Sequence, residues 1–156
     1  MFTGIVEEVG KINSIVKEEI SIKCEKILEN SKIGDSISVS GICLTITKIN
    51  QDNLSFQISE ETKSKTILGK KQSINYVNLE RAATFESRIG GHLIEGHVES
   101  TAMCKEINQL KDSTNVIFEA NPDVISNIIV KGYISIDGTS LTINKINKNL
   151  FSISLI

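Results

Sequence analysis

The sequence contains no tryptophan and a single proline, and aromatic residues make up only 4% of its 156 residues. Barrels that bind single-stranded nucleic acid stack bases on aromatic side chains and follow the backbone with basic grooves. Here acidic residues outnumber basic ones, and the formal net charge is −2. An oligonucleotide-binding barrel is therefore excluded, and we expect no nucleic-acid partner.

Long apolar runs and paired cysteines are also missing. No stretch approaches the roughly 20 apolar residues of a membrane span, and the opening MFTGIVEEVG lacks the basic start of a signal peptide. The cysteines, Cys24, Cys43 and Cys104, are odd in number and show no paired spacing. These features predict a cytoplasmic protein with reduced thiols and no membrane partner.

Two similar segments dominate what the sequence does contain. Residues 34–50 read GDSISVSGICLTITKIN, and residues 132–147 read GYISIDGTSLTINKIN. With an offset of 97, nine of the fourteen positions from Ile37 to Asn50 are identical in the second segment. Repeated segments this far apart indicate two copies of one small domain. We predict an N-terminal domain over residues 1–87 and a C-terminal domain over residues 88–156.

Apolar and polar residues alternate through both copies, which is the period of a β-strand. In the first copy the apolar positions are Ile37, Val39, Leu44, Ile46, Leu54, Phe56 and Ile58. Short strands at close spacing favour small antiparallel barrels. The predicted fold is therefore all-β, with two tandem six-stranded Greek-key barrels and short helices.

Helices are expected at two places. Residues 61–68 predict one turn of helix stopped by Gly69. The triplet Asn121-Pro122-Asp123 offers an N-cap, a proline at the first helical position and an acid in the first turn, so we expect a helix through Val130. Lys131 then reads either as a cation at the helix C-terminus or as a partner for an anion or carbonyl.

The second copy stops where the first one continues. After its matching strand the first copy runs on as EETKSKTILGKKQSINYVNLE, and nothing after Ile156 corresponds to this piece. We therefore expect the second barrel to be incomplete, and the chain to be truncated, partial or covered at its open edge by a partner.

The two copies differ in polar residues that could carry chemistry. Ser40 and Cys43 in the first copy correspond to Asp137 and Ser140 in the second. The simpler interpretations are a buried small residue for Cys43 and turn chemistry for Asp137-Gly138. Because the first copy has Ser-Gly at that turn, the turn itself does not require the acid. A carboxylate beside hydroxyls could instead hold a polyol or polarise a ring.

Both histidines lie in GGHLIEGH. Five residues apart on a regular strand, His92 and His97 would face opposite sides, so a two-histidine metal site is disfavoured. For His92, beside two glycines, a structural role is the simpler interpretation. His97 occupies the position of Ile5 in the first copy, and the exchange of an apolar residue for histidine suggests proton transfer.

Taken together and in order, MFTGIVEEVG, GICLTIT, VNLERA, GGHLIEGHVES and ISIDGTSLTI resemble riboflavin synthase of the α-chain type, a family built of two lumazine-binding barrels. The resemblance implies that two molecules of 6,7-dimethyl-8-ribityllumazine give riboflavin and 5-amino-6-ribitylamino-uracil. It implies no cofactor and no metal. It further implies a homotrimer whose active sites form between the N-terminal barrel of one subunit and the C-terminal barrel of its neighbour.

The resemblance also assigns residues. It places near proton transfer, activation or acceptor orientation the side chains of Cys43, His97, Asp137, Ser140 and Thr142. It places in the substrate pockets Phe2, Thr3, Gly4, Ile5, Val6, Ser36, Cys43, Leu44, Thr45, Gln57, Ile58, Ser59, Glu60, Glu61, Thr62, Gly96, His97, Val98, Lys131, Thr139, Ser140 and Leu141. The sequence departs from the family pattern at Glu95, at Thr139 and in its ending.

A second function is compatible with the same scaffold. A lumazine- or flavin-carrying protein would keep one pocket and lose the polar residues of the other. Because Cys43, His97, Asp137, Ser140 and Thr142 are all present, the sequence favours the enzyme.

Overall fold

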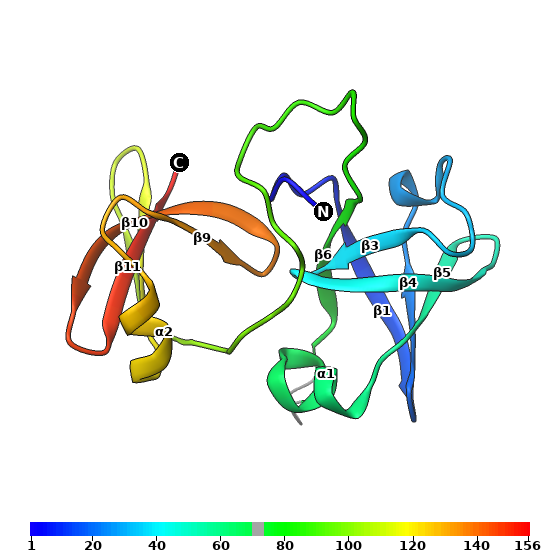
Figure 1. Cartoon of the computed structure of the whole chain (residues 1–156), viewed down its shortest axis with the longest axis horizontal. Helices are drawn as coiled ribbons and strands as arrows, with labels where there is room; N and C mark the ends of the chain where they lie inside the picture. The colour runs from blue at the N-terminus through cyan, green and yellow to red at the C-terminus, as the bar shows by residue number, and fades with distance from the viewer. Residues whose placement is uncertain (70–73) are drawn as a thin grey trace. The chain divides into compact units, whose positions relative to one another are not determined.

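Six antiparallel strands of the N-terminal region close into a barrel in the computed structural model, which describes residues 1–69 and 74–156 (Figure 1). In barrel order the neighbours are β1-β2-β5-β4-β3-β6. The strands are β1 (Glu8–Val16), β2 (Glu19–Lys23), β3 (Ser36–Val39), β4 (Ile42–Ile49), β5 (Asn53–Gln57) and β6 (Tyr76–Arg81). Short helices connect them: η1 (Lys26–Leu28), α1 (Glu60–Lys65) and η2 (Ile67–Gly69).

The barrel is filled by the alternating apolar side chains that the sequence predicts. All seven are buried in one cluster or at its rim, with at most 5% of their surface exposed: Ile37, Val39, Leu44, Ile46, Leu54, Phe56 and Ile58. Ile20, Ile22, Val77 and Leu79 complete the interior from β2 and β6. Because a strand places successive side chains on opposite faces, the intervening polar residues face outward from the barrel. Ser38 and Ser55 among them are nevertheless buried, at 2% and 3% exposure.

A second sheet of five strands has the order β7-β8-β11-β10-β9. Its strands are β7 (Met103–Gln109), β8 (Thr114–Glu119), β9 (Tyr133–Ile136), β10 (Thr139–Asn147) and β11 (Leu150–Leu155), with the helix α2 (Pro122–Asn127) between β8 and β9. This order is the barrel's order without a counterpart of β6. A closed barrel and a partial sheet with few helical turns confirm the predicted fold class.

The chain divides into two units by its contacts. The first comprises Met1–Val98 together with Ser135–Thr139, and the second comprises Glu99–Ile134 together with Ser140–Ile156. The second unit has a small core of its own, in which the rings of Phe118 and Phe151 stack with centroids 5.4 Å apart. Among the described residues, no helix combines the length and apolar character needed to cross a membrane.

The glycine of each repeated segment lies in a tight turn, as the sequence predicts. Ser40 and Gly41 have φ of 47° and 85°, and Asp137 and Gly138 have φ of 47° and 81°. Two successive positive φ values are typical of the type I′ turn, whose twist matches that of the strands it joins. Serine and aspartate both occupy the first left-handed position, so the turn does not explain the acid in the second copy.

The expected helix after Asn121 is shorter than predicted. Asn121 is its N-cap and accepts a hydrogen bond from the backbone N–H of Val124, as expected, but α2 ends at Asn127 instead of Val130. Lys131 lies beyond the helix in a left-handed conformation (φ 67°), and its N–H donates to the Ile143 carbonyl. Its interpretation as a helix C-terminal cation is therefore wrong.

The filled barrel predicts a steep dependence on core volume. Replacing the fully buried Phe56 by alanine should lower the free energy of unfolding by about 3–5 kcal/mol, because its cavity cannot collapse. Replacing Ile33, which is 67% exposed, by alanine should change the free energy of unfolding by about 0.5 kcal/mol or less. Urea unfolding of both variants tests this, and equal losses would contradict a core centred on Phe56.

Candidate functional site

The interior of a six-stranded barrel leaves no room for a ligand once its side chains are packed. A binding site on this unit must therefore use the outer face of the wall. On that face, strand pairing places Glu80 of β6, Ser38 of β3 and Cys43 of β4 in one row, because Ser38 lies opposite both of the others. Ser36 and Thr45 form the next cross-strand pair on the same face.

The barrel wall splits beside this row. The pairing of β4 with β5 begins at Ile46 and Phe56, so the earlier residues of β4 diverge from the end of β5. The edge of β4 is completed by another segment, since the Cys43 N–H donates to the Gly96 carbonyl at 2.9 Å. After β5 the chain turns into α1, whose N-cap Ser59 accepts the N–H of Thr62. Two predicted pocket stretches, Cys43–Thr45 and Gly96–Val98, thus meet at the split, and a third, Gln57–Thr62, follows the end of β5.

Two extended segments cross the outer face of the barrel. We call residues 2–7 the N-terminal strap and residues 92–98 the second strap. They pair as antiparallel chains: the Phe2 N–H donates to the Ile94 carbonyl at 2.7 Å, and the Ile94 N–H donates back at 3.0 Å. The His92 N–H donates to the Thr3 carbonyl at 3.1 Å. Phe2 is fully buried and Ile94 is 9% exposed, so the two straps form one packed layer.

Gly96 is the point where the second strap meets the wall. Its φ is 84°, and a Cβ added there would lie 2.7 Å from the Cys43 Cβ and 3.0 Å from the Phe2 ring. Only glycine allows this close approach and this conformation together. The carbonyl of Gly96 therefore reaches Cys43, and Val98, two residues later, packs against the barrel core.

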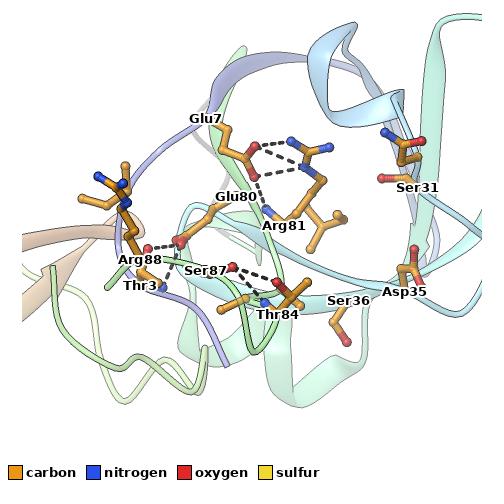
Figure 2. A pocket seen from close by; sticks show the side chains of 15 residues that line it. Thr3, Glu7, Ser31, Asp35, Ser36, Glu80, Arg81, Thr84, Ser87 and Arg88 are labelled. Carbon is orange, nitrogen blue, oxygen red and sulfur yellow. Dashed lines mark hydrogen bonds and ion pairs between the residues drawn. The ribbon is translucent and has the colours of Figure 1, made fainter. Parts of the chain in front are cut away.

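The N-terminal strap is fastened by two consecutive residues of β6 (Figure 2). The Glu80 carboxylate accepts the N–H and hydroxyl of Thr3, both at 2.7 Å, and the N–H of Gly4 at 3.0 Å. Arg81 binds the Glu7 carboxylate through Nε, Nη2 and its backbone N–H. Burial raises the pKa of Glu7, but the hydrogen bonds and charge of Arg81 outweigh it, and the pKa is lowered overall.

A cavity of about 680 Å³ lies between the N-terminal strap, β3 and the loop that follows β6 (Figure 2). The predicted pocket residues Thr3, Ile5 and Ser36 line it. Most of its other lining groups are polar or charged: Glu7, Asn30, Ser31, Asp35, Glu80, Arg81, Thr84, Ser87 and Arg88. Hydroxyls, carboxylates and guanidinium groups together suit a ligand with many hydroxyl groups.

The predicted pocket residues differ in what they can offer a ligand. Leu44 and Ile58 are 5% and 1% exposed and face the core, so only their backbone is available at the wall. The His97 side chain is 81% exposed, with Nδ1 3.5 Å from a carboxylate oxygen of Glu95. The stretch from His92 to His97 forms no regular strand and has only the bridge at Ile94. The expectation that the two histidines face opposite sides of a strand therefore does not hold.

Asp137, at the turn before β10, and Thr139, the first residue of β10, belong to the first unit. Partial burial raises the pKa of the Asp137 carboxyl, although its side chain still reaches solvent. The backbone carbonyl of Asp137 accepts a hydrogen bond from the Asn78 amide at 2.9 Å. Partial burial also lowers the pKa of His92.

The remaining predicted residues belong to the second unit. Ser140, Leu141 and Thr142 follow one another along β10, where alternation places Ser140 and Thr142 on one face and Leu141 on the other. Lys131 is exposed. Among the described residues, no group of three or more histidine, cysteine or acidic side chains has the arrangement of a metal site.

The fastening residues Glu7, Glu80 and Arg81 are missing from the predicted site. Glu80 and Arg81 lie in the VNLERA string, which carries the family resemblance but received no residue roles. One signal was available: a glutamate following the inward-facing Leu79 belongs on the outer face, directly beside an arginine. The hydrogen-bond partners of Glu80 lie in the N-terminal strap, more than seventy positions away in the sequence.

Comparisons with known proteins bear directly on this geometry. A model of the lumazine binding domain matches residues 3–82 and 95–156. The chain belongs to the lumazine-binding domain family. The riboflavin synthase of Bacillus subtilis (strain 168) is 40% identical over 163 residues, covering 100% of this chain and 74% of the relative. That of Schizosaccharomyces pombe is 38% identical over 162 residues, covering 100% and 78%.

Solved structures of the family share the fold. LumP complexed with riboflavin superposes with a TM-score of 0.88 at 29% identity, covering 99% of this chain and 86% of that chain. LumP complexed with 6,7-dimethyl-8-(1'-D-ribityl) lumazine gives a TM-score of 0.85 at 28% identity, with the same coverage. This lumazine-binding domain protein is therefore related to enzymes and to structures with bound lumazine and flavin.

The contact of Gly96 with Cys43 predicts a specific defect. Gly96→Ala should lower the free energy of unfolding by about 2–5 kcal/mol, from backbone strain plus collision with Cys43 and Phe2. Gly34→Ala is the matched control: its φ is 97°, but no atom lies within 4 Å of the added Cβ. Gly34→Ala should lower the free energy of unfolding by the backbone strain alone, about 1–2 kcal/mol.

The rate of thiol labelling at Cys43 measures the same displacement of the second strap from the wall. In a Cys104→Ser background, Gly96→Ala should speed labelling of Cys43 under native conditions, and Gly34→Ala should not. Cys24 stays silent in this assay, because burial raises the pKa of its thiol to about 11. Equal stability losses together with unchanged Cys43 labelling would show that the strap does not rest on the wall.

Proposed function

We propose that this protein is a riboflavin synthase, which converts two molecules of 6,7-dimethyl-8-ribityllumazine into riboflavin and 5-amino-6-ribitylamino-uracil. One observation carries the proposal. Cys43–Thr45, which resembles the pocket of the N-terminal barrel, and Gly96–Val98, which resembles the pocket of the C-terminal barrel, are joined by the Cys43–Gly96 hydrogen bond. The whole chain aligns with riboflavin synthases at 38–40% identity, which supports the same reading.

The proposed reaction moves a four-carbon unit from one lumazine to the other. One molecule loses a proton from its 7-methyl group, and the resulting carbanion attacks a second molecule activated at C7 by a nucleophile such as water. The two products together contain all atoms of the two substrates, so no outside oxidant or co-reactant is needed. The proton transfers are assigned to groups among Cys43, His97 and Ser140, and acceptor orientation to Asp137 and Thr142.

These side chains suit their roles to different degrees. His97 is exposed on a strap anchored by Gly96, so its ring nitrogens are accessible to a bound ring. Partial burial raises the pKa of the Asp137 carboxyl, whose oxygens can accept hydrogen bonds from a substrate N–H or hydroxyl group. Much of the rate would come from holding two rings together, since effective molarities can reach the order of 10⁵ M or more.

Several further features complete the proposal. The domains are residues 1–87 and 88–156, two copies of one lumazine-binding unit that each hold one substrate molecule. The protein works as a homotrimer in the cytoplasm. The cavity beside Ser36 and Thr3 suits a ribityl chain, because hydroxyl groups along its lining can exchange hydrogen bonds with a polyol.

The alternative is a lumazine- or flavin-binding protein without catalysis. The similarity to LumP complexed with riboflavin, at a TM-score of 0.88, favours it. Binding and turnover must therefore be measured separately.

Incubation with 6,7-dimethyl-8-ribityllumazine alone distinguishes the two functions. A synthase forms riboflavin without any addition, which is followed by its absorbance and fluorescence. A carrier binds the lumazine and leaves it unchanged. Failure to bind either compound would contradict both functions.

Two aspartate variants test whether the Asp137 carboxyl contributes to turnover. Asp137→Asn keeps a residue that tolerates the left-handed turn but loses the ionisable carboxyl, and it should lower turnover by roughly tenfold or more. Asp112→Asn, in the exposed turn between β7 and β8, should leave turnover unchanged. Equal turnover in both variants would reduce Asp137 to a turn residue.

A further inference from the structure

Both carboxylate oxygens of Glu80 accept hydrogen bonds from the N-terminal strap. The residue is 5% exposed, and one oxygen accepts the Thr3 N–H and hydroxyl while the other accepts the Gly4 N–H (Figure 2). Burying a charge is costly unless hydrogen bonds replace its water. A chain that needed only a stable barrel could place an apolar residue there, so the buried acid calls for a further reason.

All three groups that meet Glu80 are donors. A carboxylate has only acceptor oxygens, so it satisfies them at once, whereas an amide would turn an NH₂ group toward at least one of them. The site is therefore chemically selective for an ionised carboxylate. Charge-assisted bonds of this kind are shorter and stronger than neutral ones, which fits the 2.7 Å distances to Thr3.

The strap held by Glu80 leads to the split in the wall. Phe2, adjacent to Thr3, pairs through both backbone hydrogen bonds with Ile94 of the second strap. Two residues further on, Gly96 accepts the Cys43 N–H. The wall provides a second connection, because Glu80 and Cys43 flank Ser38 in one row of the sheet. Glu80 thus fixes one end of a layer whose other end lies on Cys43.

We infer that Glu80 is a positioning residue of the ligand site: it holds the paired straps against the wall, so that Ile5 at the cavity and Gly96–Val98 at the split keep their places. The inference rests on the proposed function for its ligand. Glu80 makes no contact with substrate in this role. Its carboxylate acts through Thr3 and Gly4, and loss of its charge loosens the straps while the barrel core stays packed.

A second glutamate provides a matched control. Glu8 also accepts two backbone N–H groups with its two oxygens, those of Glu25 and Ile27 at 2.7 and 2.8 Å. It fastens η1, which belongs to neither strap. Glu80→Gln and Glu8→Gln therefore make the same chemical change at two carboxylate–backbone contacts, only one of which leads to the split.

The test combines amide hydrogen exchange with riboflavin binding and steady-state kinetics on the full chain. Glu80→Gln should speed exchange at Gly4, Ile94 and Cys43 by roughly tenfold or more and weaken riboflavin binding by a similar factor, the effect of one lost charge-assisted bond. KM should rise by more than kcat falls. Glu8→Gln should leave exchange at these amides and riboflavin affinity unchanged, whatever it does to thermal stability.

Thr3 supplies the independent variants in case Glu80→Gln does not fold. Thr3→Val removes one of the three donors and should reproduce the exchange and affinity changes in weaker form, whereas Thr3→Ser should restore wild-type values. Exchange at Cys43 is read without any turnover, so the inference can fail while the enzyme function stands, and the reverse. Unchanged Cys43 exchange and riboflavin affinity in Glu80→Gln, or in Thr3→Val where Glu80→Gln does not fold, would overturn it.

Discussion

A barrel of six strands has too little interior for anything but its own side chains, and the candidate site follows from that constraint. Phe56, Ile46 and their neighbours fill the inside, so every group able to meet a ligand belongs to the outer face or to segments laid across it. The row Glu80–Ser38–Cys43 provides the floor. The two straps pack directly on this floor, so a ligand must bind beside them, where β4 diverges from β5.

The straps have little regular structure of their own, so their position depends on a few strong contacts. Glu80 and Arg81, consecutive on β6, use opposite charges to fasten the two ends of the N-terminal strap. Glycine at position 96 lets the second strap reach the edge of β4. The charged contacts of Glu80 and Arg81 and the close approach of Gly96 therefore hold the two straps at separate points. The candidate site depends on each of these contacts.

Sequence patterns predicted what depends on local rules. The alternation around Leu44 and Phe56 gave the core face, and the glycines at 41 and 138 gave the tight turns. Helix α2 began where predicted but ended early: its N-cap contact is local, whereas the residues after it pair with β10 through hydrogen bonds of Lys131 and Gly132 with Ile143. The Glu80–Thr3 contact was not predictable in this way, since only closure of the barrel brings β6 to the first residues.

In the proposed function the ligand binds on the outer wall at the split, beside the second strap. Titration of the isotope-labelled protein with riboflavin, followed by amide chemical shifts, tests it most directly. The largest changes should fall on Cys43, Thr45 and Gly96–Val98, with small changes for the inward-facing Ile22 and Leu54. Changes centred on the barrel interior, or none at Cys43 and Gly96 despite binding, would contradict binding at the split.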